Sequence, residues 1–150
     1  MNLIKQIAAL VFTKLFSSGL EKVSSQYPHK EFFIVEKNGD LDSLMNAAKI
    51  FGESKKWKLA EIKTREEARI ITWVEGGFGT SWPRTVGFEA RETPDKFYIW
   101  AESRYNRNQM IDRGENKKNI ELLKTFFSQN YKVVPTDLTW EEADKQVPLK

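Results

Sequence analysis

Four strand-like segments follow one another along the middle of the chain, and this run limits the possible folds more than any other feature. They span residues 57–63, 69–75, 84–91 and 96–103. The alternation of side chains is clearest in Val86–Arg91 and is typical of a strand with one face toward water. A charged turn at Thr64–Glu67 and a proline turn at Thr93–Asp95 join the segments in pairs. Consecutive strands joined in this way form an antiparallel sheet.

The segments on either side of this run complete an α+β pattern. Glu31–Glu36 is an apolar, partly β-branched run that predicts a further strand. A helix is expected to begin at Asp40 or Asp42 and to end at Gly52. A second helix is expected from about Gly114 to Gln129, and the capping-box pattern at Thr139–Glu142 predicts a short terminal helix.

Including a helix at the N-terminus, the predicted order is helix, strand, helix, four strands, helix. We therefore expect an α+β fold with an antiparallel sheet of about five strands, covered by helices on one face. This domain takes up residues 21–150, after an N-terminal amphipathic helix over residues 1–20.

The segment Met1–Leu20 has two possible placements. Its apolar residues recur at helical spacing, and Lys14 interrupts the apolar run well before the roughly 20 residues that a membrane span needs. No small-x-small cleavage site follows, so a secretory signal is not expected. The helix either packs on the domain or lies in the headgroup plane of a membrane surface.

Composition argues against several kinds of site. The 150 residues contain no cysteine and a single histidine, His29, which excludes thiolate and multi-histidine metal sites and a cysteine nucleophile. No calcium-loop motif occurs, and neither a metal nor another cofactor is expected. A cysteine-free chain suits the reducing cytoplasm, which is the expected location, with association to a membrane through Met1–Leu20 as the alternative.

The net charge and the absence of two sequence motifs argue against several classes of partner and enzyme. The net charge of +3 is small beside 24 basic and 21 acidic residues, so it favours anionic partners only weakly and argues against nucleic acid. The glycine-rich stretch Gly76–Pro83 lacks the lysine and the following helix of a phosphate-binding loop. No Gly-x-Ser-x-Gly elbow occurs, which argues against a serine hydrolase.

The most informative segment is the polar stretch Ser103–Asn116, which is longer than a plain strand-to-helix connection requires. It carries three arginines, a tyrosine and several amides. Guanidinium groups beside a helix N-terminus suit the recognition of a carboxylate or a phosphate. A structural role stays open, in which Arg104 and Asp112 form an ion pair that fixes the loop and Asn116 caps backbone groups.

Three stretches of the sequence resemble the domain of unknown function 1499 family of bacteria and plastids. They are Val23-Ser24-Ser25-Gln26 followed by His29, then Ala101-Glu102-Ser103-Arg104, and finally the stretch from Asp112 to Leu123, and together they span about residues 23–129. The resemblance implies that Ser25, Arg104, Asp112 and Asn116 converge at one end of the sheet. It implies no activity, because the family has no established one.

These features predict a non-enzymatic small-ligand-binding or accessory module whose partner is a small anionic molecule. The candidate binding residues are Ser25, His29, Arg104, Arg107, Asp112, Arg113 and Asn116. Two other functions stay open: a peripheral membrane protein held by Met1–Leu20, and an enzyme acting on a phosphorylated or carboxylated metabolite with Asp112 or His29 as base. The sequence identifies no protein partner.

Overall fold

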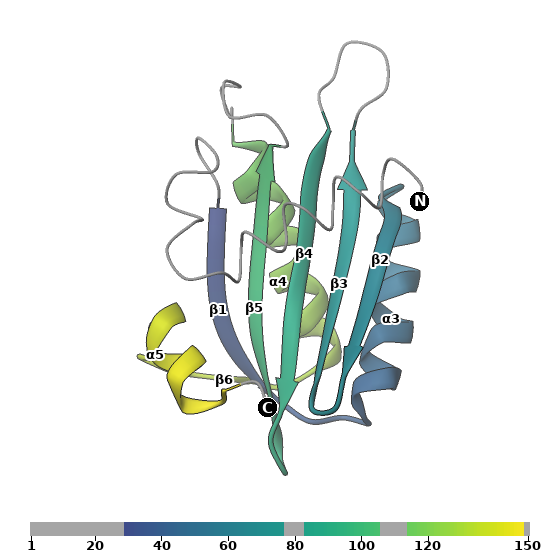
Figure 1. Cartoon of the computed structure of the whole chain (residues 1–150). Helices are drawn as coiled ribbons and strands as arrows, with labels where there is room; N and C mark the ends of the chain where they lie inside the picture. The colour runs from purple at the N-terminus through teal and green to yellow at the C-terminus, as the bar shows by residue number, and fades with distance from the viewer. Residues whose placement is uncertain (1–28, 77–82, 106–113, 149–150) are drawn as a thin grey trace.

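The computed structural model describes residues 29–76, 83–105 and 114–148, and these form an antiparallel sheet with helices on both faces (Figure 1). The strands are β1 (His29–Glu36), β2 (Lys58–Arg65), β3 (Ala68–Glu75), β4 (Arg84–Glu92), β5 (Lys96–Tyr105) and β6 (Val133–Val134). The helices are α3 (Leu41–Ser54), α4 (Glu115–Asn130) and α5 (Trp140–Gln146). The helix predicted at Met1–Leu20 lies outside the described residues.

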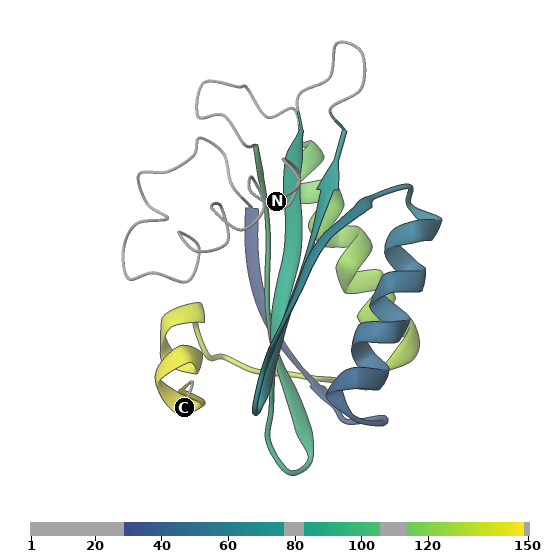
Figure 2. The same ribbon diagram turned by 45° about the vertical axis from the view of Figure 1, so that its right-hand side comes forward.

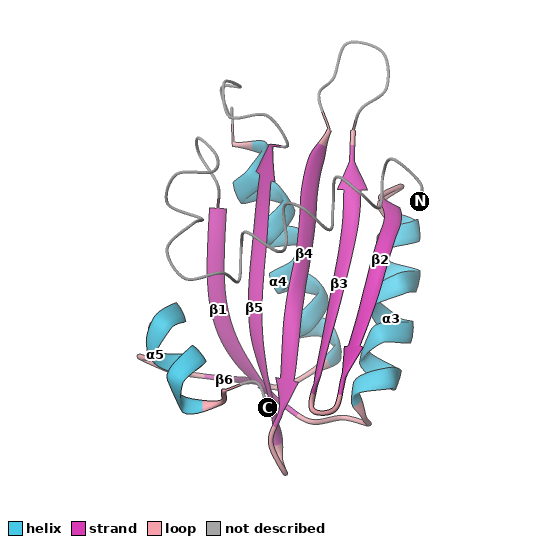
Figure 3. Cartoon of the chain, viewed as in Figure 1, coloured by secondary structure: helices cyan, strands magenta, loops and turns pink. Residues whose placement is uncertain are grey.

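The strands follow the order β2-β3-β4-β5-β1-β6, and every neighbouring pair is antiparallel. The predicted α+β class is therefore confirmed. The described sheet has six strands rather than about five, because the two-residue β6 adds to the edge of β1 (Figure 3). So short a strand leaves no alternating pattern in the sequence from which it could be recognised.

Helices α3 and α4 cover one face of the sheet, and α5 lies on the opposite face (Figure 2). The expectation that all helices share one face was therefore wrong for α5. We call the two sides the helix face, under α3 and α4, and the outer face, which carries α5. The main core lies on the helix face, where Trp73, Phe88 and Phe127 are almost completely buried.

Local signals explain how α3 begins. The side chain of Asp40 accepts a hydrogen bond from the backbone nitrogen of Ser43 at 2.8 Å, which caps the first turn. The helix then continues past Gly52 to Ser54, so the prediction that Gly52 ends it was wrong. Gly52 is buried against the indole of Trp73, and an added Cβ atom would lie only 2.8 Å from Cε2 of that ring. A close approach, not a helix end, therefore requires glycine here.

Strand β4 differs from its prediction in a way that bears on function. The alternating pattern predicted one wet face, yet every residue from Arg84 to Arg91 is buried. Phe88 and Ala90 face the helices, while Glu89 and Arg91 face outward and are covered there. At the centre of the sheet, the outer face is therefore covered, and charged side chains are buried there.

Candidate functional site

The structure describes three of the seven sequence-predicted site residues, namely His29, Arg104 and Asn116. They stand at the start of β1, near the end of β5 and in the first turn of α4. The other four, Ser25, Arg107, Asp112 and Arg113, lie outside the described residues.

Asn116 belongs to a buried amide and hydroxyl network on the helix face. The hydroxyl of Ser103 donates to Oδ1 of Asn116 at 2.9 Å, and Nδ2 of Asn119 donates to the same hydroxyl at 3.2 Å. All three side chains are at least 95% buried. His29 is paired with Ser103 in the β1–β5 register, so its side chain lies on this same face. The structure thus brings His29 and Asn116 to one face, where Asn116 ties α4 to the sheet.

The role of this network in stability can be tested at Ser103. Ser103→Ala should lower the free energy of unfolding by about 1–2 kcal/mol, because two buried amides each lose a hydrogen-bond partner. The measurement is urea denaturation followed by circular dichroism. Ser128→Ala, at an exposed position of α4, is the control and should change stability by less than about 0.5 kcal/mol. Equal effects of the two substitutions would contradict a structural role for the network.

Arg104 lies on the outer face, away from Asn116. Its Nε donates to Oε1 of Glu102 at 2.6 Å, and both side chains are almost completely buried. Because residues two apart in a strand share a face, Arg104 and Glu102 point away from α4 while Ser103 between them points toward it. The structure therefore does not bring Arg104 to the same site as His29 and Asn116.

A second buried pair lies next to the first on the outer face. Nε of Arg91 donates to the carboxylate of Glu89, and the Arg91 guanidinium stacks on the ring of Trp100 at 4.3 Å. Burial raises the pKa of the Glu89 carboxyl, and the neighbouring Arg91 opposes that rise. The sequence carries a signal for both pairs: Glu-x-Arg occurs in β4 as Glu89-Ala90-Arg91 and in β5 as Glu102-Ser103-Arg104.

These outer-face residues fix the position of α5. The guanidinium of Arg91 donates to Oδ1 of Asp144 at 2.6 Å and to the carbonyl of Val147 at 2.7 Å. The indole nitrogen of Trp100 donates to the carbonyl of Trp140 at 3.1 Å. Both ends of the helix are thereby held on the sheet.

The start of α5 is also fixed locally. Thr139 and Glu142 form a capping box, in which each side chain bonds the backbone nitrogen of the other residue. The capping box predicted at this position is therefore confirmed. It sets the direction in which the first turn of α5 presents Trp140 and Glu141.

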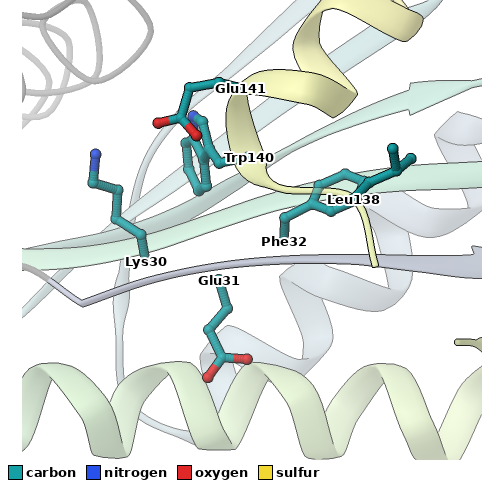
Figure 4. A pocket seen from close by; sticks show the side chains of 6 residues that line it. All are labelled: Lys30, Glu31, Phe32, Leu138, Trp140 and Glu141. Carbon is teal, nitrogen blue, oxygen red and sulfur yellow. The ribbon is translucent and has the colours of Figure 1, made fainter. Parts of the chain in front are cut away.

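A pocket of about 320 Å³ lies between the first turn of α5 and β1 (Figure 4). We call it the α5 pocket, and its lining residues are Lys30, Glu31, Phe32, Leu138, Trp140 and Glu141. The ammonium nitrogen of Lys30 lies 5.3 Å from the centroid of the Trp140 ring. Phe32 packs on Trp100 and Tyr98, with ring centroids 5.1 and 6.0 Å apart, so the apolar wall is supported from the sheet.

Glu31 is among the residues that line the pocket, but its carboxylate points out of the pocket. Figure 4 shows its side chain pointing toward α4. There the carboxylate lies 2.9 Å from Nζ of Lys124, and this hydrogen bond raises the pKa of Lys124. It also lies 3.4 Å from the ring nitrogen Nε2 of His29. The charge of Glu31 is therefore balanced on the helix face, outside the pocket.

A further pocket, of about 440 Å³, lies where the β4–β5 hairpin meets the end of α5. Lys37 and Glu92 in its lining are already joined by an ion pair of 2.9 Å. Its other walls include Pro94, Val147 and Pro148, with no aromatic ring among the described residues that line it. It thus offers less for the recognition of a charged ligand than the α5 pocket does.

The described residues carry neither a metal site nor a membrane-spanning helix, and no family or relative is shown for the chain. Within the described ranges, no cluster of three or more carboxylate or histidine side chains could hold a metal ion. None of the described helices combines the length and apolarity needed to cross a membrane. No family model matches the chain, and no curated protein matches it. The resemblance to the domain of unknown function 1499 family stays a prediction.

Proposed function

We propose that the chain is a non-enzymatic binding module whose α5 pocket takes a small carboxylate with an apolar ring. The observation that carries the proposal is the position of Lys30, whose ammonium group stands over the ring of Trp140 at a pocket with Phe32 and Leu138 among its walls. A cation beside aromatic and aliphatic walls matches a ligand with one anionic and one apolar part.

The dimensions and support of the pocket favour a compact ligand. Its volume of about 320 Å³ lies at the lower end of the range for small-molecule sites. Trp140 is held by the bond from Trp100 to its carbonyl, and Phe32 by its packing on the sheet. Walls that are ordered before binding cost less entropy when the ligand arrives.

This proposal keeps the ligand class expected from the sequence and changes its place. The expected ligand was a small anion, and the expected residues lay around Ser103–Asn116. Of these, Asn116 and Arg104 are engaged in buried contacts with Ser103 and Glu102. The α5 pocket places a lysine and two aromatic rings around one cavity. Membrane association through Met1–Leu20 stays a prediction.

The proposal is tested by titrating the protein with 3-phenylpropionate, a ring joined to a carboxylate, and following binding by NMR. Lys30→Gln should weaken binding by about tenfold, because the loss of a charge-assisted hydrogen bond at a partly open site is worth about 1.4 kcal/mol. Lys145→Gln changes the charge equally on the exposed side of α5 and should leave the affinity within about twofold. Equal affinities of Lys30→Gln and the wild type would contradict the proposal.

A further inference from the structure

Glu141 is the one acidic side chain of the α5 pocket whose charge is not already balanced by a described residue. It lines the pocket and forms no ion pair or hydrogen bond with the described part of the chain. The next residue, Glu142, is used by the capping box with Thr139. Glu31 is engaged with Lys124 on the other face of the sheet. Glu141 therefore remains to face a ligand.

The two charged groups stand toward one end of the pocket. The ammonium group of Lys30 lies over the ring of Trp140, and in the view of Figure 4 the carboxylate of Glu141 is seen toward the same end of the pocket, with Phe32 and Leu138 toward the other end. A ligand held there meets both signs of charge at its head and apolar surface along its body. A ligand with both charges suits this arrangement better than a ligand with one, because Glu141 weakens the binding of a simple anion and Lys30 weakens the binding of a simple cation.

We propose that the ligand of the α5 pocket is a zwitterion of the amino-acid type with an apolar side chain. Lys30 binds its carboxylate, Glu141 binds its ammonium group, and Phe32 and Leu138 contact its side chain. The inference rests on the function proposed above for the same pocket and names the ligand class more closely.

Three probes that share a phenylethyl group separate the charge types. They are L-phenylalanine, 3-phenylpropionate and phenethylamine, which are a zwitterion, an anion and a cation at neutral pH. Each is titrated into the full-length protein, and binding is followed by NMR. L-phenylalanine should bind about tenfold more tightly than either of the other two, since only it satisfies both charged groups.

Two neighbouring substitutions provide a matched comparison. Glu141→Gln should weaken the binding of L-phenylalanine by about tenfold and should leave 3-phenylpropionate bound as tightly as before or more tightly. Glu142→Gln makes the same change of charge one residue away, and its amide oxygen keeps the capping-box acceptor, so the affinities should stay within about twofold.

The outcomes separate this inference from the function on which it rests. The inference of a zwitterionic ligand is wrong if 3-phenylpropionate binds as tightly as L-phenylalanine, or if Glu141→Gln leaves the affinity for L-phenylalanine unchanged. In either case the pocket still binds carboxylates, as the proposed function requires. If none of the three probes binds, both the inference and the proposed function are wrong.

Discussion

Replacing Arg91 with alanine should lower the free energy of unfolding by about 3–5 kcal/mol. Arg91 is 4% exposed, and its partner Glu89 is completely buried. Removing the guanidinium leaves the completely buried Glu89 carboxylate without its ion-pair partner. The same change removes the bonds to Asp144 and Val147 that hold the C-terminal end of α5.

The loss caused by Arg91→Ala should depend on pH in a definite direction. Burial raises the pKa of the Glu89 carboxyl in the folded protein, and Arg91 works against that rise. Without Arg91 the folded-state pKa rises further above the unfolded-state value, so the variant keeps most of its stability in acid and loses it as the pH rises through the folded-state pKa. Urea denaturation at acid and at neutral pH measures both the loss of unfolding free energy and the direction in which that loss changes with pH.

Two further variants check that an uncompensated charge, not lost packing, causes the effect. Lys96→Ala breaks the solvent-exposed ion pair with Asp95 and should destabilise the protein far less than Arg91→Ala does. The double substitution Glu89→Leu with Arg91→Met removes both buried charges and should be more stable than Arg91→Ala alone. If the double variant is as unstable as Arg91→Ala, the account of the buried pair is wrong.

Gly52→Ala should destabilise the protein by about 2–3 kcal/mol, although alanine normally stabilises a helix by about 1 kcal/mol relative to glycine. The added Cβ atom would lie 2.8 Å from Cε2 and 2.9 Å from Cδ1 of the Trp73 indole. That ring is 1% exposed and packs on Trp57 and Phe88, so it has little room to move away. The sign of the effect therefore depends on the contact between α3 and β3.

The measurement is thermal or urea unfolding of Gly52→Ala beside Asn46→Ala, an alanine substitution at an exposed position of the same helix. Asn46→Ala should stabilise the protein by a few tenths of a kcal/mol, in line with the helix propensities. A stabilising effect of Gly52→Ala would show that α3 does not approach Trp73 as closely as the structure has it.

The fold was largely predictable because its signals are local. The turns at Thr64–Glu67 and Thr93–Asp95, the cap at Asp40 and the capping box at Thr139 each act over a few residues, and the strands and helices appear where these signals bound them. Strand β6 and the extension of α3 past Gly52 were missed. The first is too short to show a pattern. In the second case the glycine that was interpreted as a helix end lies against Trp73, a tertiary contact that no local pattern reveals.

The burial of the outer face was not predictable from alternation alone. Glu89 and Arg91 read as water-facing residues because charged side chains usually are. They are buried because each neutralises the other and because α5 supplies Asp144 as a further partner. Recognising this from sequence requires noticing that Glu-x-Arg occurs in two strands, Glu89–Arg91 and Glu102–Arg104, that pair with one another.

The α5 pocket was missed for a related reason. The sequence indicated the start of α5 but not the face of the sheet on which it lies. Phe32 reads as a member of an ordinary strand, Lys30 stands just before that predicted strand, and Trp140 reads as one more aromatic residue for the core. Contacts between distant residues, among them the bond from Trp100 to the carbonyl of Trp140, bring these residues together, and no local pattern encodes a contact over 40 positions.

The most direct test of the proposed function is to locate the binding of 3-phenylpropionate by NMR, from the shifts of the backbone amides and tryptophan indoles. We expect the shifts to concentrate at Lys30–Phe32 and at Leu138–Glu141, with the indole of Trp140 among the most affected. Shifts centred instead on Ser103 and Asn116, or no shifts at all, would contradict a ligand site beneath α5.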